Sequence, residues 1–306
     1  MSDYHKPVML EECLKGMNIQ PGGTYVDVTF GGGGHSKGIM NCLSEGGRLF
    51  AFDQDQDALN NELPEEGFQL IHQNFRHLKN YLRVFGVRQV DAVLADLGVS
   101  SYQFDKADRG FSIRFEALLD MRMDQESDLT AVRILNEYEE NELAEIFKNY
   151  GELRGSYRMA RAIVNARSNA SVTTMEELKQ IAKPFMPPRK ENQFMAQLFQ
   201  ALRIEVNDEL NALKEMLEQA SEILRPGGRL VVMSYHSLED RLVKNFINNG
   251  KFEGEAEKDF YGNKLVPLKK ISRKPITATA EELTLNTRSR SAKLRIAEKL
   301  DVKPND

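Results

Sequence analysis

The sequence predicts an α/β fold in which a mostly parallel sheet is interrupted by an inserted all-helical domain. Three observations lead to this prediction. Strand and helix patterns alternate through the first hundred residues, helical patterns alone fill the next hundred, and strand patterns return after Arg225. Alternation at this spacing is typical of right-handed crossovers that join parallel strands.

Four strands are expected in the first hundred residues, because each segment is rich in β-branched or aromatic residues and is bounded by turn residues. They are Tyr25–Thr29, Arg48–Phe52, Phe68–His72 and Val90–Ala95. The helices expected between them are His35–Cys42, Asp57–Leu63 and Leu78–Phe85. Pro64 and Gly86 end the last two of these helices.

Helical patterns then follow without a convincing strand. The expected helices are Thr130–Leu135, Glu139–Phe147, Met159–Arg167, Thr174–Ala182 and Ala196–Leu224, the last as one long helix or a pair. Thr174 and Glu177 have the spacing of a capping box. A connection between two parallel strands needs only a dozen or more residues, so most of the residues between the fourth and fifth expected strands are not needed for it. We therefore predict an inserted helical domain at residues 103–203, within a sheet domain formed by residues 1–102 and 204–306.

Strand patterns return in the last quarter of the chain. The segment Arg225-Pro226-Gly227-Gly228 is expected to end the long helix, because proline and glycine stop helices. The strands expected after it are Arg229–Ser234, Lys264–Leu268 and Lys293–Ala297, with a helix at Leu242–Asn248.

The composition is that of a globular protein of one large or two ordinary domains. The chain has 306 residues, of which 41% are hydrophobic and 28% are charged, and a formal net charge of −5. Its two cysteines, Cys13 and Cys42, exclude a disulfide framework and are expected to be small apolar helix residues. The sequence contains no apolar run of membrane-spanning length and starts without a secretory signal. We therefore expect a cytoplasmic protein that makes no membrane contact.

Four consecutive glycines separate the first expected strand from its helix. Gly31–Gly34 would let a ligand approach the backbone closely. Ser36 stands where a dinucleotide fingerprint has its third glycine, and the spacing from Asp27 fits acid-x-x-x-Gly-x-Gly better. An acid in that place would repel a pyrophosphate. It suits a ligand with a cationic amino-acid group, such as S-adenosylmethionine (SAM).

Two further acids end strands. Asp53 lies about twenty residues past the glycines, where a carboxylate accepts hydrogen bonds from a ribose diol. Asp96 ends the fourth strand, at the edge where open α/β sheets bind ligands. There it can accept a proton from an amino group that is being alkylated, although a helix N-cap is the alternative. Phe75 suits either an adenine contact or the core.

The small net charge conceals two basic regions. Residues 105–152 carry 13 acids and 6 bases, residues 154–203 carry 9 bases and 3 acids, and residues 264–299 carry 10 bases and 3 acids. Basic surfaces of this kind suit nucleic-acid phosphates. The candidate RNA contacts are Arg154, Arg158, Arg161, Arg167, Arg288, Arg290, Lys293 and Arg295. For the four in the insert, salt bridges to its acidic half are the alternative.

Eight separated motifs run through almost the whole chain. They are His5-x-Pro7-Val8, Asp27–Ser36, Asp96–Ser101, Arg109–Ser112, Leu119–Asp124, Phe199–Ile204 with Asn207, Ser234–Arg241 and Thr287–Arg295. Together they resemble the bacterial small-subunit rRNA methyltransferase H family, also called MraW. The resemblance implies a Rossmann-like class I SAM methyltransferase fold with a helical insert. It also implies methyl transfer from SAM to the exocyclic N4 of one cytosine in the decoding centre of 16S rRNA.

The resemblance also implies roles for single residues. Matched by motif, the SAM contacts are Gly33, Gly34, His35, Asp53, Phe75, Asp96 and Gln103. Because the lone pair of a cytosine N4 is delocalised, catalysis would consist of positioning this nitrogen and accepting its hydrogens. We expect Asp96 to be the acceptor, assisted by Ser100 or Ser101. His236 is expected to shape the base pocket, with an ordinary N-cap as the alternative, and no metal is expected.

Two positions depart from the family's pattern. Asn192–Leu198 replaces a segment that often reads His-Pro-Ala-Thr-Arg-Thr, and Tyr235 stands where phenylalanine is usual and is expected to be tolerated. The implied partner is small-subunit rRNA within an assembled or late-assembling subunit, and a homodimer is left open. Two rival functions remain: an NAD(P)-dependent oxidoreductase on the same fold, and a non-catalytic RNA-binding factor.

Overall fold

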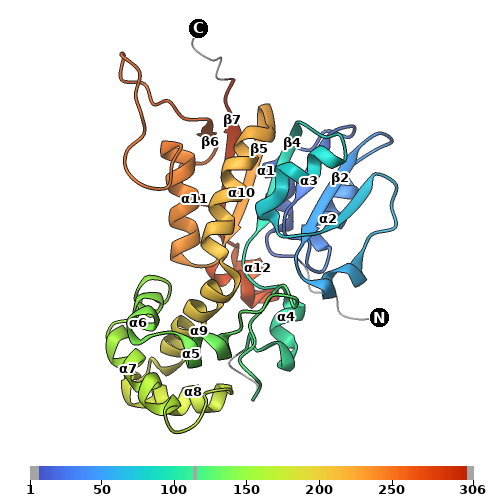
Figure 1. Ribbon diagram of the computed structural model, residues 1–306. Helices are drawn as coiled ribbons and strands as arrows, with labels where there is room; N and C mark the ends of the chain where they lie inside the picture. The colour runs from blue at the N-terminus through green and yellow to red at the C-terminus, as the bar shows by residue number, and fades with distance from the viewer. Residues whose placement is uncertain (1–6, 113–115, 302–306) are drawn as a thin grey trace. The chain divides into compact units, whose positions relative to one another are not determined.

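The computed structural model describes residues 7–112 and 116–301, and the strands within these ranges form one sheet in the order β3-β2-β1-β4-β5-β7-β6 (Figure 1). The strands are β1 (Thr24–Asp27), β2 (Arg48–Asp53), β3 (Phe68–His72), β4 (Val90–Asp96), β5 (Leu224–Ser234), β6 (Leu268–Lys270) and β7 (Lys293–Lys299). The first five pair in parallel, whereas β7 is antiparallel to both of its neighbours. The predicted α/β fold with a mostly parallel sheet is confirmed.

The chain divides into two compact units. The sheet unit comprises Met1–Gly98 and Leu210–Asp306, and the helical unit is Val99–Glu209. The insert predicted at 103–203 lies four residues inside this helical unit at its start and six at its end.

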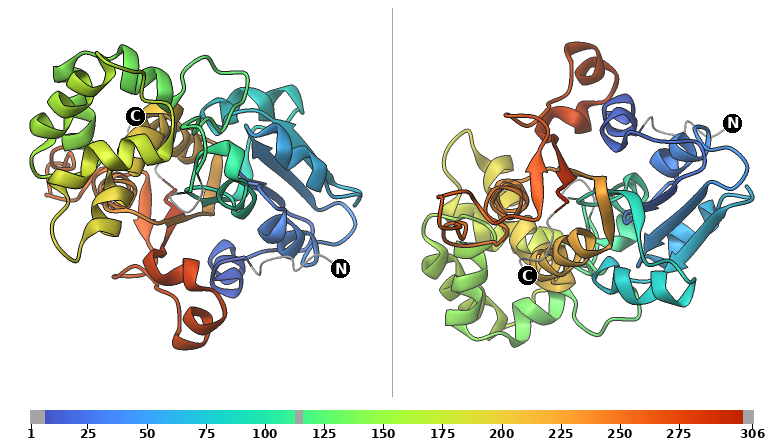
Figure 2. Two further views of the ribbon diagram at one scale, coloured as in Figure 1. Left: turned by 90° about the horizontal axis from the view of Figure 1, so that it is seen from below. Right: turned by 90° about the horizontal axis from the view of Figure 1, so that it is seen from above.

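Helices cover both faces of the sheet (Figure 2). One face carries α1 (Leu10–Met17) and α2 (Gly34–Met40), and the other carries α3 (Leu78–Val84), α10 (Glu209–Ile223) and α11 (Ser237–Asn249). Successive strand residues point to opposite faces. Leu49 of β2 therefore packs on the face that carries α1 and α2, and Phe50 packs on the face that carries α3, α10 and α11. The five parallel strands end at the same edge of the sheet.

The helical unit is built around its own core. Its helices are α4 (Ser101–Asp105), α5 (Ala131–Glu137), α6 (Glu140–Asn149), α7 (Ser156–Arg167), α8 (Met175–Ala182) and α9 (Glu191–Asn207). Residues at helical spacing, such as Leu143 and Phe147, are fully buried there. The capping box between Thr174 and Glu177 is confirmed. Within the described ranges, no helix has both the length and the apolar character that a membrane crossing requires.

The segment expected at Ala196–Leu224 as one long helix or a pair is a pair, because Asp208 adopts a left-handed conformation (φ 47°) between α9 and α10, and it begins earlier, at Glu191. The structure corrects the boundary predicted after this pair. The Pro-Gly-Gly segment does not precede β5 but lies inside it. The register with β4 shifts between Val90 and Ala92, so that the extra residues form an irregularity in which Gly227 has φ +79°.

Other elements differ from the prediction as well. The strand expected at Lys264–Leu268 is β6, three residues long and starting at Leu268, and the helix expected at Asp57–Leu63 is a 3-10 helix, η1 (Gln56–Asn61). The helices α1, α4 and α12 (Ala280–Leu285) were not predicted. Cys42 is exposed and follows α2, so the expectation of an apolar helix residue is wrong for Cys42 and right for the buried Cys13.

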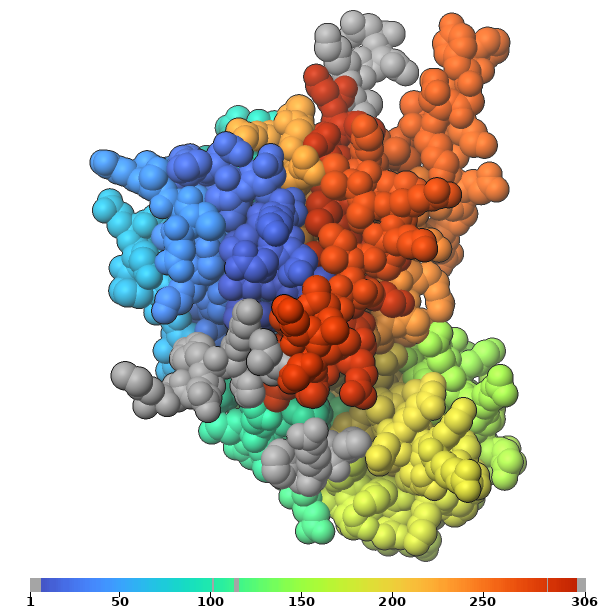
Figure 3. All heavy atoms as spheres, turned by 180° about the vertical axis from the view of Figure 1, so that it is seen from behind, coloured from blue at the N-terminus to red at the C-terminus, as the bar shows by residue number. Residues whose placement is uncertain are grey.

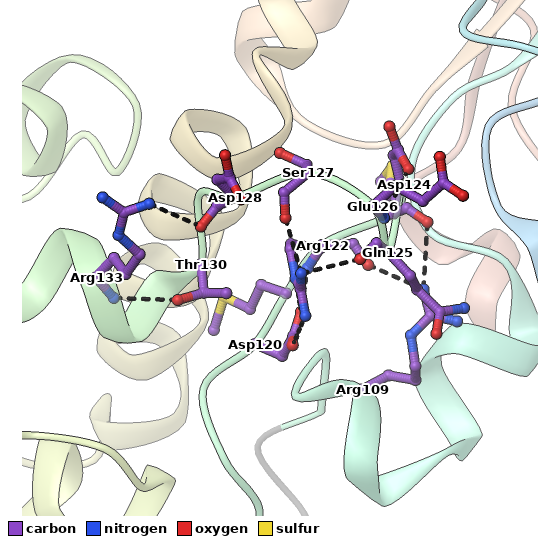
Figure 4. Close-up of polar contacts among 12 residues, drawn as sticks. Arg109, Asp120, Arg122, Asp124, Gln125, Glu126, Ser127, Asp128, Thr130 and Arg133 are labelled. Atoms are coloured by element: carbon purple, nitrogen blue, oxygen red, sulfur yellow. Dashed lines mark hydrogen bonds and ion pairs between the residues drawn. The ribbon is translucent and has the colours of Figure 1, made fainter.

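A polar network orders the loop that leads into α5 (Figure 4). The Arg122 guanidinium donates to both oxygens of Asp120, at 2.9 and 2.7 Å, and also to the Ser127 carbonyl at 2.7 Å. The buried Arg109 donates to the Arg122 carbonyl at 2.9 Å, and the Asn207 amide accepts from the Met123 N–H at 2.7 Å. Three of the motifs therefore meet in one structural network of the helical unit.

We expect Asp120→Ala to lower the free energy of unfolding by about 2 kcal/mol, because the Arg122 guanidinium loses its bidentate partner. Burial alone would raise the pKa of Asp120, but the hydrogen bonds and charge of Arg122 lower it overall. Because the pKa of Asp120 is lower in the folded protein than in the unfolded chain, its carboxylate stabilises the fold fully above the unfolded pKa. This contribution is lost as the pH falls through the folded pKa. Urea unfolding should therefore separate Asp120→Ala from the wild type at pH 7 and much less at pH 3. Glu126→Ala, an exposed acid of the same loop, is the control and should change little.

Candidate functional site

The carboxyl ends of four neighbouring parallel strands carry the candidate site residues around the glycine loop. The glycine loop follows β1, Asp53 ends β2, Asp96 ends β4, and Tyr235 and His236 follow β5. Since β2, β1, β4 and β5 are adjacent, these residues share one edge of the sheet. This is the edge at which open α/β sheets bind ligands.

Two positions of the glycine loop disfavour any side chain. Gly33 has φ +75°, and a Cβ there would lie 3.0 Å from the Phe30 ring. A Cβ on Gly34 would lie 2.9 Å from Pro7. The Gly33 N–H donates to the Phe30 carbonyl at 2.8 Å, which closes the turn before α2. The loop therefore presents backbone rather than side chains at the strand ends.

Asp53 ties this loop to β2. Its Oδ2 accepts the Gly31 N–H at 2.7 Å and its Oδ1 accepts the Asp55 N–H at 2.9 Å. A carboxylate has about four lone-pair positions, so both oxygens retain capacity for a further donor. Burial raises the pKa of Asp53 to about 6, even though the two backbone hydrogen bonds lower it.

Asp27 orders the loop rather than facing a ligand. Its side chain is only 1% exposed, and it accepts the Ser36 hydroxyl at 2.7 Å and the Thr29 N–H at 3.1 Å. These contacts join the end of β1 to the first turn of α2. Ser36, which stands where a dinucleotide fingerprint has its third glycine, is therefore the hydrogen-bond partner of Asp27.

Asp96 is held between two side chains from opposite parts of the sequence. Its Oδ1 accepts the Tyr235 hydroxyl at 2.7 Å, and its Oδ2 lies 3.6 Å from His35 Nδ1. The His35 ring is fixed in turn, because Nε2 donates to the Val8 carbonyl at 3.0 Å. The Asp96 side chain keeps 22% of its surface exposed, so it remains within reach of a bound molecule.

The electrostatics of this cluster favour an acceptor that titrates near neutrality. Burial raises the pKa of Asp96 to about 6, and the attraction of His35 and the hydrogen bond from Tyr235 offset only part of that rise. Burial and the Asp96 carboxylate raise the pKa of Tyr235 well above its ordinary value, so its hydroxyl remains the donor. Burial also raises the pKa of the Cys13 thiol, which stays neutral.

His236 begins α11 as its N-cap. The Glu239 N–H donates to His236 Nδ1 at 3.5 Å, and Glu239 Oε2 accepts the Tyr235 and His236 N–H groups at 2.9 and 3.2 Å. The geometry is that of a capping box, which is the N-cap role given above as the alternative for His236.

His236 also borders a pocket of about 240 Å³ in the sheet unit. The lining residues are Tyr235, His236, Ser237, Thr277, Arg290, Ser291, Ala292 and Lys293.

Comparison with known proteins decides the family. A family model described as the MraW methylase family matches residues 2–300. The chain belongs to the MraW methylase family. It is 57% identical over 298 residues to the Ribosomal RNA small subunit methyltransferase H of Flavobacterium johnsoniae, which covers 97% of this chain and 98% of that protein. The protein of the same name from Bacteroides thetaiotaomicron is 55% identical, covering 97% of each chain, and that from Christiangramia forsetii is 53% identical, covering 98% and 99%.

Three of the residues implied by the MraW resemblance, Ser100, Ser101 and Gln103, belong to the helical unit. The Ser100 hydroxyl accepts the Gln103 N–H at 3.1 Å, and the Gln103 carboxamide accepts the Ser100 N–H at 3.0 Å, so the pair caps α4. Ser101 is the first residue of α4, and its side chain lies outside the described part of the structure. His5, in the first family motif, also lies outside the described residues.

The basic residues of this MraW-family chain differ in how they are engaged. Arg161 pairs with Glu140 at 3.1 Å, as the salt-bridge alternative predicts, whereas Arg167 donates to the Leu135 carbonyl at 2.9 Å. Arg154 and Arg158 are exposed, and Arg158 lies over the Phe185 ring at 5.6 Å.

In the tail, one acid neutralises part of the predicted basic patch. Asp240 accepts from Arg295 at 2.7 and 3.2 Å and from Lys293 at 3.4 Å. These contacts hold the pKa of Asp240 below its usual range, although burial alone would raise it. Arg290 is exposed at the pocket, and Arg288 is half-buried on the same 3-10 helix, η5 (Thr287–Ser291). Arg154, Arg158, Arg161 and Arg290 are thus the predicted contacts that lie exposed, and Arg161 pairs with Glu140 while keeping 70% of its side chain exposed.

Tyr235 is the site residue that the sequence did not single out. In the sequence it is only a departure from the MraW pattern that is expected to be tolerated. Its contact with Asp96 spans 139 residues of chain, so local patterns cannot reveal it. The available signal was its position directly after β5, beside the end of β4.

Proposed function

We propose that this chain transfers the methyl group of SAM to the exocyclic N4 of a cytosine in the 16S rRNA of the small ribosomal subunit. Membership of the MraW methylase family and the names of its relatives support the reaction class and the substrate. The observation that carries the chemistry is the partly exposed Asp96 carboxylate, fixed by Tyr235 and His35 at the end of β4.

The residues at the strand ends fit SAM. The glycine loop offers backbone at close range, and Asp53 retains acceptor capacity for a ribose diol beside it. Gly33, Gly34 and Asp53 would hold the cofactor, with Phe75 partly exposed at the end of β3. When bound, SAM supplies an electrophilic methyl group on a sulfonium centre.

The chain's own contribution is positioning and proton acceptance. A cytosine N4 becomes nucleophilic as its lone pair leaves conjugation, and a carboxylate that accepts its N–H favours that change. Asp96 would accept this hydrogen bond and then the proton that the nitrogen loses on methylation. The hydrogen bond from Tyr235 keeps the Asp96 carboxylate in one orientation during these steps.

The helical unit is proposed to recognise the RNA around the target base. Its exposed Arg154 and Arg158 suit phosphates, and in the sheet unit Arg290 places a further cation at the pocket beside Tyr235. A base in folded rRNA must be splayed out of its stack to reach a protein pocket. We further propose an assembled or late-assembling small subunit as the substrate, in the cytoplasm.

The test uses SAM with a labelled methyl group. The protein is incubated with small subunits from a strain that lacks this gene, and the rRNA is digested to nucleosides. Label in N4-methylcytidine supports the proposal, and subunits from the parent strain, already modified, are the control and should take up little. Failure to transfer label together with failure to bind SAM would refute it. SAM binding without transfer would favour the non-catalytic factor.

Tyr235→Phe should move the acidic limb of the rate profile to higher pH by about one unit, because a hydrogen bond that lowers the pKa of Asp96 is removed. The other charged or polar groups that face Asp96 are His35, Asp27 and Glu239, and they are unchanged. The measurement is kcat against pH with saturating substrates. Tyr25→Phe removes another buried tyrosine hydroxyl bond, to Gln20, and should leave the limb in place. If Tyr235→Phe lowers kcat equally at every pH and leaves the acidic limb in place, the Tyr235 hydroxyl has only a structural role.

A further inference from the structure

The imidazole of His35 is a buried base that the proposed reaction leaves unused. The residue is only 6% exposed and lies in the first turn of α2. Its Nε2 lies 3.0 Å from the Val8 carbonyl, and because a carbonyl oxygen can only accept, Nε2 carries the ring proton. A neutral imidazole has one N–H, so its Nδ1 is then an unprotonated acceptor.

The Val8 carbonyl is held in place by the turn that begins α1. Met9 is the N-cap of α1 and has a left-handed backbone (φ 51°, ψ 41°), which a residue with a side chain rarely adopts. The Met9 N–H donates to the Glu282 carboxylate of α12 at 3.3 Å, and the Cys13 N–H donates to the Met9 carbonyl at 3.0 Å. Figure 3 shows the two segments side by side, the first in dark blue and α12 in orange-red. Contacts from both ends of the chain therefore fix which nitrogen of His35 is protonated.

The unprotonated Nδ1 faces the carboxylate that accepts the proton in the proposed reaction. It lies 3.6 Å from Asp96 Oδ2, longer than a hydrogen bond, as for two acceptors with no proton between them. A proton on either atom would let the two form a hydrogen bond. Burial raises the pKa of Asp96 and of Asp27, and the attraction of a protonated His35 offsets part of each rise. Two buried carboxylates thus favour a positive charge on this ring.

The other titratable groups near the ring do not compete for this proton. Burial raises the pKa of the Cys13 thiol in α1 and of the Tyr235 hydroxyl, so both stay protonated. Lys37 of α2 is exposed. Within the described ranges, His35 is thus the base that lies beside the Asp96 carboxylate.

We propose that His35 is a positioning residue that acts through Asp96 and takes over the proton that this carboxylate accepts. The inference rests on the proposed function, which places the methylated N4 beside Asp96. Once N4 carries the methyl group, its N–H bond breaks and an O–H bond forms at Asp96 Oδ2. That O–H bond then breaks as an N–H bond forms at His35 Nδ1, while Nε2 keeps its own proton. The site ends with an imidazolium beside a carboxylate, and it releases the proton to solvent with the product.

His35→Gln should slow single-turnover methyl transfer at pH 8 by about 10²-fold, the lower end of the effect of a positioned base, because Asp96 remains. The glutamine can still donate to the Val8 carbonyl but has no basic nitrogen. SAM affinity should be unchanged, since the buried ring leaves only the His35 backbone for the cofactor. The measurement uses the full-length protein, unmodified small subunits and SAM with a labelled methyl group. His77→Gln, an exposed histidine before α3, is the control and should keep the wild-type rate.

Chemical rescue separates a base from a packing role. His35→Ala leaves space for a small ring, and added imidazole should raise its rate by about tenfold. Pyrazole has the same shape but is hardly basic, so it should leave the rate unchanged. Equal rescue by both rings would overturn the proposal, and so would the absence of rescue by imidazole.

The protonation of the ring can be read directly from its nitrogen chemical shifts in protein with labelled histidine, with His35→Gln to assign the signals. At pH 8 the wild type should carry one proton, on Nε2, and none on Nδ1. A proton on Nδ1 at this pH would overturn the proposal, because the ring could then accept nothing. If the wild type transfers label and His35→Gln is equally fast, this inference alone fails. If the wild type transfers no label, the proposed function fails.

Discussion

Asp96→Asn should abolish detectable methyl transfer while SAM still binds. The asparagine keeps the size of the side chain and can still accept the Tyr235 hydroxyl, but it cannot take up a proton. Loss of a positioned proton acceptor costs about 10²–10⁴ in rate. The measurement is single-turnover transfer of a labelled methyl group to unmodified small subunits, with SAM affinity determined in parallel by calorimetry.

The same acceptor predicts the pH profile of the wild type. Because burial raises the pKa of Asp96 to about 6, its reactive carboxylate form is populated above that pH and lost as the pH falls through it. The rate should therefore rise with pH and level off above about 7. Asp91→Asn is the matched control, since Asp91 lies at the opposite end of β4 and accepts the Thr24 N–H there. A variant of Asp96 that kept more than about a tenth of the wild-type rate would argue against its role as acceptor.

Asp53→Ala should weaken SAM binding by about 10- to 100-fold. The change removes an acceptor for the ribose diol, and each hydrogen bond to a charged group contributes about 1.5–3 kcal/mol. It also removes the anchor of the Gly31 N–H, so the glycine loop loses its tie to β2. Titration calorimetry with SAM and with adenosine should show parallel losses, because both ligands carry the ribose.

The control for this variant is Glu62→Ala, an exposed acid just past η1, which should leave SAM affinity unchanged. Asp53→Asn should fall between the wild type and Asp53→Ala, since the amide oxygen still accepts one N–H. Equal SAM affinity in Asp53→Ala and the wild type would remove Asp53 from the proposed cofactor site.

The parts of the fold that sequence could predict are those that local patterns determine. Alternating strands and helices gave the parallel sheet, and the rule that ligands bind at strand ends selected Asp53 and Asp96 before any geometry was known. The capping box at Thr174 is equally local, because its two partners lie three residues apart.

The parts that sequence could not predict depend on pairs far apart in the chain. Tyr235 finds Asp96 only through the pairing of β4 with β5, and Ser36 is recognised as the partner of Asp27 only when α2 follows β1. Charge counts likewise could not decide which arginines are engaged. Arg161 pairs with Glu140, whereas Arg167 of the same helix donates to the Leu135 carbonyl and not to an acid.

The insertion between β4 and β5 also affects how the chain folds during synthesis. β5 begins at Leu224, 128 residues after Asp96 ends β4. At ribosomal speeds of about 5–20 residues per second, the backbone edge of β4 waits roughly 6–26 s for its partner. An unpaired strand edge is a template for aggregation. The helical unit has its own core and can fold in this interval, so the nascent chain should depend on chaperones most strongly between the emergence of β4 and that of β5.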